Sequence, residues 1–154
     1  MNKVLYIILI SLFSLTVISC AKKSSDDSSS STDNTTTSDN TATSDNTTTT
    51  TTTPESYVAV GDSGTILTSS DNGTSWNSMT SGTSKLLNEV TYGNSIFVTV
   101  GYGGTILTSL DNGTTWNDRS KTKRLWGVTY ANSTFTVVGN SGTIYTSSDG
   151  TTWT

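Results

Sequence analysis

An internal repeat constrains the fold of this chain more than any other feature. The segment YVAVGDSGTILTSSDNGTSW (57–76) matches FVTVGYGGTILTSLDNGTTW (97–116) and again FTVVGNSGTIYTSSDGTTW (135–153). The pieces between them match as well, because LNEVTYGNSIF (87–97) aligns with LWGVTYANSTF (125–135). The repeat length is roughly 40 residues, which is typical of folds that stack one supersecondary unit on the next.

Each copy predicts four short strands. LNEVTY and LWGVTY form the first; YVAV, FVTV and FTVV the second; TILTS and TIYTS the third; and the fourth begins at Thr-Ser-Trp or Thr-Thr-Trp. The chain shows no helical periodicity, and a unit of about 40 residues with four strands has the size of one propeller blade. We therefore predict an all-β domain at 55–154 with blades of four antiparallel strands, about 2.75 repeats in all. The units are 57–86, 87–124 and 125–154.

The stretch GDSGT (61–65) spells the sequence around the nucleophile of trypsin-like proteases. The other copies read GYGGT and GNSGT, so the glycines recur and the tip of the loop varies. A serine nucleophile needs a base, usually histidine, and the chain has no histidine. Ser63 is therefore predicted to lie in a hairpin turn.

A second motif recurs at the next turn. SSDNGTSW (69–76) and SLDNGTTW (109–116) resemble the Asp-box of the bacterial neuraminidase repeat, and SSDGTTW (147–153) is one residue shorter. The aspartates can accept backbone N–H bonds, the glycines can take a positive φ, and the tryptophans can pack on the hairpin. The predicted structural positions are Ser69, Asp71, Gly73, Trp76, Ser109, Asp111, Gly113, Trp116, Ser147, Asp149, Gly150 and Trp153.

Families with this box include sialidases, sortilin-like receptors, some glycoside hydrolases and photosystem II assembly factors. The resemblance implies a propeller with the box on its outer rim, but these families differ in function, so no activity follows from it. The Asp-Asn-Gly turns lack the alternating oxygen ligands and distal glutamate of a calcium loop. With one cysteine and no histidine, the chain predicts no metal site and no cofactor.

The N-terminus, MNKVLYIILISLFSLTVISC, predicts export. Lys3 precedes an apolar stretch, and the residues up to Cys20 resemble a bacterial lipobox. The resemblance implies cleavage before Cys20 and lipidation of its thiol, and Ala21 in place of aspartate favours the outer membrane or cell surface. We predict a signal peptide at 1–19 and a disordered Ser/Thr/Asp/Asn-rich tether at 20–54. An ordinary signal peptide and a short uncleaved anchor remain open alternatives.

Charge and composition exclude some functions. The net charge is −4, whereas nucleic-acid binders normally show a basic patch. Retaining glycosidases need two carboxylates about 5 Å apart, and the only glutamates are Glu55 and Glu89. The only arginines, Arg119 and Arg124, are too few for a sialidase-like cluster. We therefore predict a protein that is not an enzyme.

The predicted function is binding. In a propeller, the loops between strands two and three share a face with the loops that lead into the next blade. The candidate binding face consists of Asp62, Lys85, Tyr102, Arg124, Trp126 and Asn140, with Asn88 and Lys123 nearby. An aromatic ring and a cation suit contact with protein or glycan. The alternative for Trp126 is packing on a neighbouring blade.

From Tyr57, the predicted strands number three, four and four in the successive units, fewer than a closed propeller needs. Three arrangements remain open: part of a longer propeller protein such as a glycoside hydrolase or assembly factor, a ring completed by homo-oligomerisation, or a small open stack. The function that fits best is a surface-anchored lipoprotein that binds protein or glycan, or acts as a scaffold. A purely structural envelope protein remains the alternative.

Overall fold

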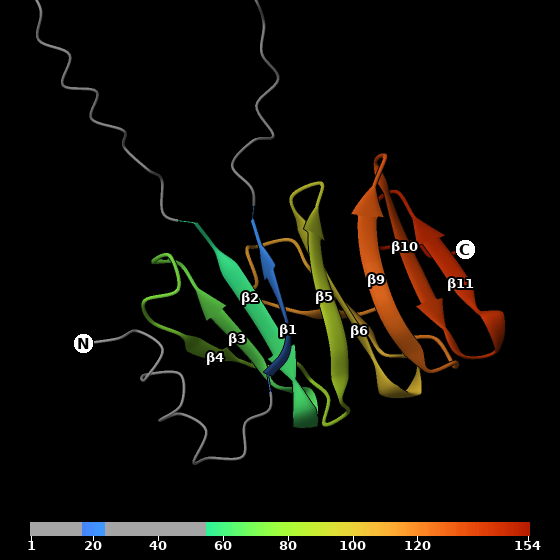
Figure 1. The fold of residues 1–154 in the computed structure, drawn as a ribbon, viewed down its shortest axis with the longest axis horizontal. Coiled ribbons are helices and arrows are strands. Elements are labelled where there is room, and N and C mark those ends of the chain that lie inside the picture. Colours follow the sequence, from blue (N-terminus) through green and yellow to red (C-terminus); the bar gives the residue numbers. More distant parts are fainter. Residues whose placement is uncertain (1–16, 24–54) are drawn as a thin grey trace, which may run out of the picture.

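The computed structural model describes residues 17–23 and 55–154, which form strands joined by turns (Figure 1). Three single-turn 3₁₀ segments interrupt the strands, η1 (Asp62–Gly64), η2 (Tyr102–Gly104) and η3 (Asn140–Gly142). The strands are β1 (Val17–Lys22), β2 (Tyr57–Gly61), β3 (Ile66–Ser69), β4 (Asn77–Met79), β5 (Leu87–Gly93), β6 (Ile96–Gly101), β7 (Ile106–Ser109), β8 (Asn117–Asp118), β9 (Leu125–Ala131), β10 (Thr134–Gly139) and β11 (Ile144–Ser147). No helix among the described residues is long and apolar enough to span a membrane.

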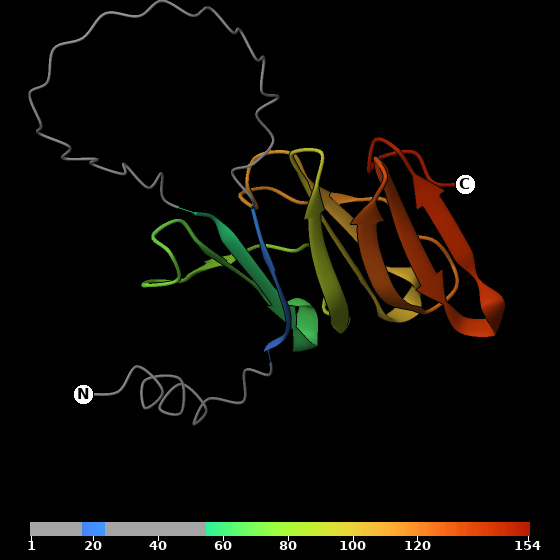
Figure 2. The ribbon, with the colours of Figure 1, turned by 45° about the horizontal axis from the view of Figure 1, so that its top comes forward.

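The strands form three antiparallel sheets in chain order, which we call blades 1, 2 and 3. Blade 1 has the order β1-β2-β3-β4, blade 2 the order β5-β6-β7-β8, and blade 3 the order β11-β10-β9. Both ribbon views show the blades next to one another from left to right, with blade 2 in the middle (Figures 1 and 2). The register repeats, because Tyr57 pairs with Ser69, Phe97 with Ser109 and Phe135 with Ser147. The predicted all-β fold of antiparallel blades is thus confirmed, with four strands in blades 1 and 2.

Strand β1 forms the first strand of blade 1, the position that β5 and β9 have in the other blades. It comes from a part of the chain that the repeat does not cover. Val17 pairs with Gly61 and Ser19 with Val60, with an irregularity between the two pairs. The same irregularity separates Leu87 from Glu89 in blade 2. VISCAK therefore takes the place that LNEVTY and LWGVTY take in the other blades.

This placement differs from the sequence-based boundaries. The sequence assigns Val17–Ser19 to the signal peptide and Cys20–Lys22 to the tether, whereas the structure places both in one strand of a sheet. A short apolar stretch suits either role, so hydrophobicity alone does not separate them. The rest of the predicted signal peptide and of the tether, residues 1–16 and 24–54, lies outside the described residues.

Blade 3 has three strands where the sequence predicts four. In the place of the fourth, Thr154 exchanges two backbone hydrogen bonds with Thr146, at 2.8 and 3.1 Å. This single pair of bonds is too short a ladder to count as a strand. The blades therefore contain four, four and three strands, with β1 making up the first set.

The core lies between the blades. We call the face of a blade toward the next blade in the chain its front, and the opposite face its back. The front of blade 3 is the face that carries the equivalent residues. One cluster joins the front of blade 1 to the back of blade 2: Val58, Val60, Ile66, Leu87, Val90, Phe97 and Leu107. The other joins the front of blade 2 to the back of blade 3: Ile96, Val98, Val100, Ile106, Leu125, Val128, Phe135, Val137 and Trp153. Because blade 2 is covered on both faces, all six residues of β6 are buried.

Candidate functional site

The turns between the second and third strands set up one rim of the molecule. In each turn a backbone N–H closes the loop, as when Gly101 N donates to Thr105 O at 2.9 Å. The second residue of each 3₁₀ turn has a left-handed backbone: Ser63 at φ 56°, Gly103 at φ 67° and Ser141 at φ 56°. Ser63 therefore has the same turn geometry as a glycine in the next copy, as expected of a residue with a structural place in a hairpin.

Backbone hydrogen bonds tie these turns to the segments that enter and leave the blades. Tyr102 N donates to Leu86 O at 2.9 Å, and Asn140 N donates to Arg124 O at 2.9 Å. Lys121 N also donates to Gly104 O at 2.8 Å. The two kinds of loop thus share one rim, as the sequence predicts for the candidate binding face.

A cluster at this rim, which we call the arginine cluster, consists of Tyr102, Arg124, Trp126 and Asn140. The Arg124 guanidinium carbon lies 3.8 Å from the centroid of the Trp126 ring and 4.9 Å from that of Tyr102. Trp126 Nε1 donates a 2.6 Å hydrogen bond to Asn140 Oδ1. The four residues come from η2, the segment before β9, β9 itself and η3, so two blades build the cluster together.

The rings of the arginine cluster face solvent. Tyr102 is 52% exposed and Trp126 is 47% exposed, so Trp126 is not buried against a neighbouring blade. Arg124 is half-buried, and its Nε is a buried atom that has no hydrogen-bond partner among the described residues. Two exposed aromatic rings beside one guanidinium leave apolar and cationic surface together where a ligand can reach them.

The other predicted residues lie around this cluster or beside it. Lys85 lies over η2, since a side-chain carbon at Gly103 would come within 3.0 Å of Lys85 Nζ. Asp62 is exposed in η1, the equivalent turn of blade 1. Asn88 instead donates a 2.6 Å hydrogen bond to Leu125 O, so it links blade 2 to blade 3.

The turns that resemble an Asp-box, which we call the Asp turns, hold their aspartates in local hydrogen bonds. In blade 1, Ser75 N and Ser69 Oγ both donate to Asp71 Oδ1, at 2.9 and 2.8 Å, and Ser75 Oγ donates to Oδ2 at 2.6 Å. These bonds, led by the one from the Ser75 hydroxyl, lower the pKa of Asp71 to about 2. The carboxylate is thus held ionised and engaged within its own turn.

The other two Asp turns repeat this arrangement. In blade 2, Thr115 N and Ser109 Oγ each donate to Asp111 Oδ1 at 2.8 Å. In the shorter turn of blade 3, the backbone N–H groups of Thr152 and Thr151 lower the pKa of Asp149. The glycines have positive φ, at 79° for Gly73, 87° for Gly113 and 66° for Gly150. The geometry is that of a structural turn.

The tryptophans of the Asp turns in blades 2 and 3 close their turns and face the preceding blade. Trp116 Nε1 donates to Gly113 O at 2.9 Å, and Trp153 Nε1 donates to Gly150 O at 3.2 Å. Trp116 packs against the cluster between blades 1 and 2, and Trp153, 7% exposed, belongs to the cluster between blades 2 and 3. Trp76 of blade 1 is 38% exposed.

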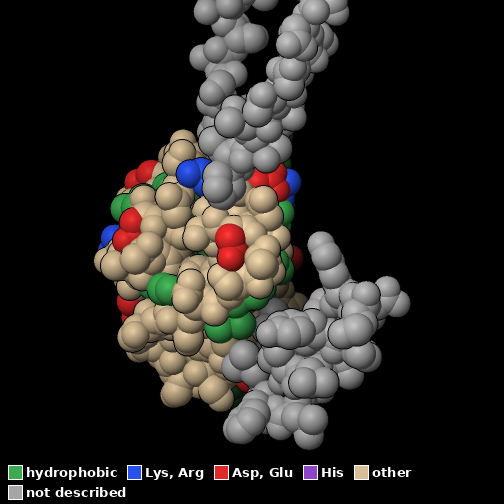
Figure 3. Space-filling model, turned by 90° about the vertical axis from the view of Figure 1, so that its left-hand side faces the viewer, with side chains coloured by type: hydrophobic (Ala, Val, Ile, Leu, Met, Phe, Trp, Pro, Cys, Tyr) green, Lys and Arg blue, Asp and Glu red, His purple; other side chains and the backbone are tan. Residues whose placement is uncertain are grey.

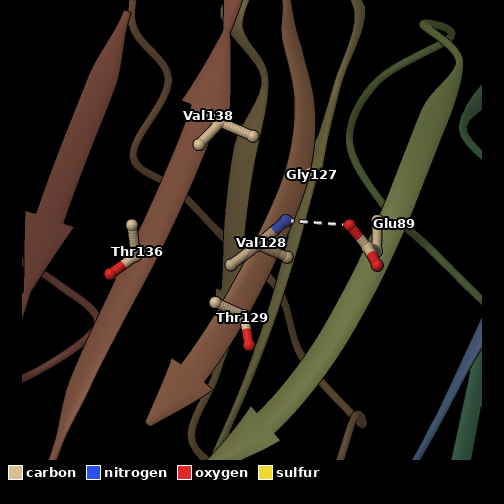
Figure 4. A pocket seen from close by; sticks show the side chains of 6 residues that line it. All are labelled: Glu89, Gly127, Val128, Thr129, Thr136 and Val138. Carbon is tan, nitrogen blue, oxygen red and sulfur yellow. Dashed lines mark hydrogen bonds between the residues drawn. The ribbon is translucent and has the colours of Figure 1, made fainter. Parts of the chain in front are cut away.

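A shallow hollow of about 190 Å³ lies along β9 and β10, lined by Glu89, Gly127, Val128, Thr129, Thr136 and Val138 (Figure 4). Glu89 Oε2 accepts a 2.9 Å hydrogen bond from Val128 N, drawn as a dashed line in Figure 4. At the equivalent position of blade 1, Ser19 Oγ accepts a hydrogen bond from Val90 N at 3.3 Å. The sequence considers Glu89 only as a carboxylate for catalysis and does not indicate this backbone contact, because Ser19 and Glu89 can be recognised as equivalent only through the pairing of β1 with β2 and of β5 with β6.

The hollow contains a single carboxylate, so it lacks the pair that glycoside hydrolysis requires. Among the described residues, no group of three or more His, Cys, Asp or Glu side chains could hold a metal ion.

Comparison with known proteins identifies the architecture. No family model and no curated protein matches the chain. The solved structures that do match include YCF48 bound to a D1 peptide, with 20% identity and a TM-score of 0.55, and YCF48 from Cyanidioschyzon merolae, with 22% identity and a TM-score of 0.56. The chain is built of β-propeller blades.

The matches cover 64% of this chain but only 35% and 32% of the two YCF48 chains. The chain therefore spans about a third of the length of these propeller structures. At this level of identity the likeness concerns the fold alone, so the function has to be argued from the arginine cluster.

Proposed function

We propose that this chain is a non-catalytic binding module that holds a protein segment on the rim carrying the arginine cluster. The observation behind the proposal is the Arg124 guanidinium, held between two rings that are each about half exposed. Tryptophan, tyrosine and arginine are the residue types that most often dominate the energy of protein interfaces. Here all three stand together on one surface, and backbone hydrogen bonds hold the turns that carry them.

The chemistry of the cluster favours an acidic segment as the ligand. The guanidinium is positioned by its aromatic neighbours and by the chain itself, which reduces the entropy lost on binding. Its planar donors can pair with a carboxylate in a bidentate manner, and Lys85 adds a second positive charge near η2. One of the similar structures, YCF48, was solved with a D1 peptide, which supports a polypeptide as the occupant of such a fold.

The described carboxylates support a non-catalytic role. Those of the Asp turns are engaged by their own turns, as the pKa shifts of Asp71 and Asp149 reflect. Glu55 accepts a hydrogen bond from Tyr57 and pairs with Lys22, and Glu89 caps the Val128 amide. General acid–base catalysis needs a carboxyl group that is free to exchange a proton with a substrate, and each of these carboxylates is engaged by hydrogen bonds or an ion pair within the chain.

The test uses an array of random 12-residue peptides probed with the full chain, followed by titration of the strongest binders. We expect the binders to be rich in Asp and Glu, and their affinity to fall at least about tenfold in Arg124→Gln and Trp126→Ala. Arg119→Gln is the matched control, since it removes the same charge from an exposed position outside the cluster. Binding that is unchanged in both cluster variants would contradict the proposal, as would binding on a glycan array with none on the peptide array.

We further propose that the module acts at the bacterial cell envelope, anchored through a lipid on Cys20. The support is the lipobox resemblance of the residues that end at Cys20. Cleavage before Cys20 would remove Val17–Ser19 and leave Cys20–Lys22 at the inner edge of blade 1, so the lipid would be attached next to the blades. Labelling of cells with a fatty-acid analogue tests this, because the wild-type chain should be labelled and Cys20→Ser should not.

A further inference from the structure

The front of blade 3 is the one front face that no described element covers. Its apolar residues are Val138, 45% exposed, and Ile144, 63% exposed. At the same positions of blade 2, Val100 and Ile106 are completely buried under blade 3. In blade 1 the equivalent residues, Val60 and Ile66, are completely buried under blade 2.

The hollow described above opens on this face, and the equivalent place on blade 2 is filled. The hollow lies where Thr136 pairs with Thr129 and Val138 with Gly127, so these four residues share the front face. In blade 2 the equivalent pairs are Val98 with Thr91 and Val100 with Glu89. There, Leu125 and Val128 of the next blade pack on the face. The hollow is thus the place where the first strand of a following blade belongs.

The back of blade 1 is the complementary surface. In the other blades, the Asp turn packs on the front of the preceding blade. A side-chain carbon at Gly113 would come within 2.9 Å of Val58, and one at Gly150 within 3.2 Å of Ile96. At Gly73 of blade 1, the nearest atom is 3.9 Å away and belongs to its own Trp76. Leu67, which aligns with the buried Leu107, is likewise only half-buried.

Seen from the blade 1 end, small groups of hydrophobic side chains lie among other side chains and backbone (Figure 3). Each end face therefore carries part of an interface that the molecule forms twice internally, once between blades 1 and 2 and once between blades 2 and 3. The two ends are complementary to each other rather than to themselves. Such a contact is head-to-tail, and head-to-tail contacts form a ring when the rotation closes.

We propose that the front of blade 3 docks on the back of blade 1 of a second copy of this chain, and that two copies close a ring. Two copies supply six blades, within the range of four to eight in which propellers close. Ile144 then contacts β2 and β3 of the second copy, and Thr136 lies against its Asp turn at Gly73. Thr134 and Thr136 stand where blade 2 has Ile96 and Val98, so the contact is less apolar than the internal interfaces. Because the contact between copies buries less apolar surface than the internal interfaces, we expect a dimer that dissociates on dilution.

The experiment uses the full chain in cells, as two copies with different epitope tags. A photoreactive phenylalanine derivative at Ile144 should yield a cross-linked product that carries both tags, and peptide mapping should place the link within Tyr57–Ser69. The same derivative at Leu110, which is 59% exposed on blade 2, is the control and should yield no such product. A missing product, a link to a different protein or a link elsewhere in the second copy would overturn the proposal.

Co-purification of the two tagged copies provides an independent measurement. Ile144→Glu should reduce recovery of the second copy at least about tenfold, because a charge on a face that becomes buried is strongly disfavoured. Leu110→Glu places the same charge on an equally exposed apolar residue and should leave recovery unchanged. The proposal fails if the two variants recover equal amounts. Peptide binding at the arginine cluster is a separate readout, so the two proposals can fail independently.

Discussion

A pair of equivalent glycines offers the sharpest test of how the rim is built. Gly104 ends η2 at φ 80°, and Gly142 ends η3 at φ 71°. Their surroundings differ, since nothing lies within 4 Å of a side-chain carbon built at Gly142. A carbon at Gly104 would overlap the Lys121 carbonyl group and come within 3.0 Å of Thr122 N. Alanine at the two positions therefore separates backbone strain from steric overlap.

The expected losses follow from these contacts. In Gly142→Ala the left-handed backbone costs about 1–2 kcal/mol, and the lower entropy of the unfolded chain offsets about 0.4–1 kcal/mol. Its free energy of unfolding should thus fall by about 1 kcal/mol. Gly104→Ala adds displacement of the segment before blade 3, at about 1–3 kcal/mol. It also weakens the bond from Lys121 N to Gly104 O, worth about 1 kcal/mol. With the backbone strain of about 1 kcal/mol included, the total loss should be about 3–5 kcal/mol.

Urea unfolding of the full chain, followed by tryptophan fluorescence, measures both losses under the same conditions. The displaced segment leads to Arg124, so Gly104→Ala should also weaken binding of the acidic peptides, whereas Gly142→Ala should weaken it less. Equal losses of stability in the two variants would show that Lys121 does not pack on η2 as described. A larger loss in Gly142→Ala would refute the reasoning altogether.

Three further predictions follow from single contacts. Because hydrogen bonds lower the folded-state pKa of Asp71 to about 2, its contribution to stability should be present above pH ~4 and be lost as the pH falls toward 2. Thermal unfolding between pH 5 and 2 checks this, and Asp71→Asn should show a smaller loss over that range. Thr108 is completely buried and its hydroxyl has no partner among the described residues, so Thr108→Val should raise the free energy of unfolding by about 1 kcal/mol. Thr99→Val should lower it by a similar amount, because the equally buried Thr99 donates to Glu89 O at 2.8 Å; urea unfolding would contradict both if the signs were reversed. Finally, the Val90 amide should exchange hydrogen faster in a chain that begins at Cys20 than in the full chain, since Ser19 accepts its hydrogen bond; equal rates measured by NMR would argue against this role of β1.

The repeat allowed the fold class and most strands to be predicted, because strand period and turn residues agree in all three copies. The exception is β1, whose sequence VISCAK shares only its apolar character with LNEVTY and LWGVTY. Only the pairing with β2, with its irregularity at the same point, shows that the segments are equivalent. The prediction of a fourth strand in blade 3 was wrong for a simpler reason, since only Thr154 pairs with β11 in that place.

The rim could be predicted in outline, because residues that vary between copies map to turns that share one edge. The contacts within it could not. Tyr102 and Arg124 lie in different blades, and stacking between them depends on how those blades pack. Asn88 and Trp126 occupy equivalent positions, yet one bonds to the next blade and the other stays on the rim beside Arg124. Sequence identifies such a position as variable without indicating which way its side chain turns.

The same position in successive blades shows how much of the burial depends on neighbours rather than on the residue itself. Ile66 and Ile106 are completely buried and Ile144 is 63% exposed, although all three follow the same turn. In a stack where each repeat contacts only its neighbours, stability is roughly the sum of the repeats and their interfaces. An uncovered front therefore lacks the contribution that each internal interface makes, and any partner that covers it supplies that contribution. The arginine cluster needs no such partner, because blades 2 and 3 already hold it between them.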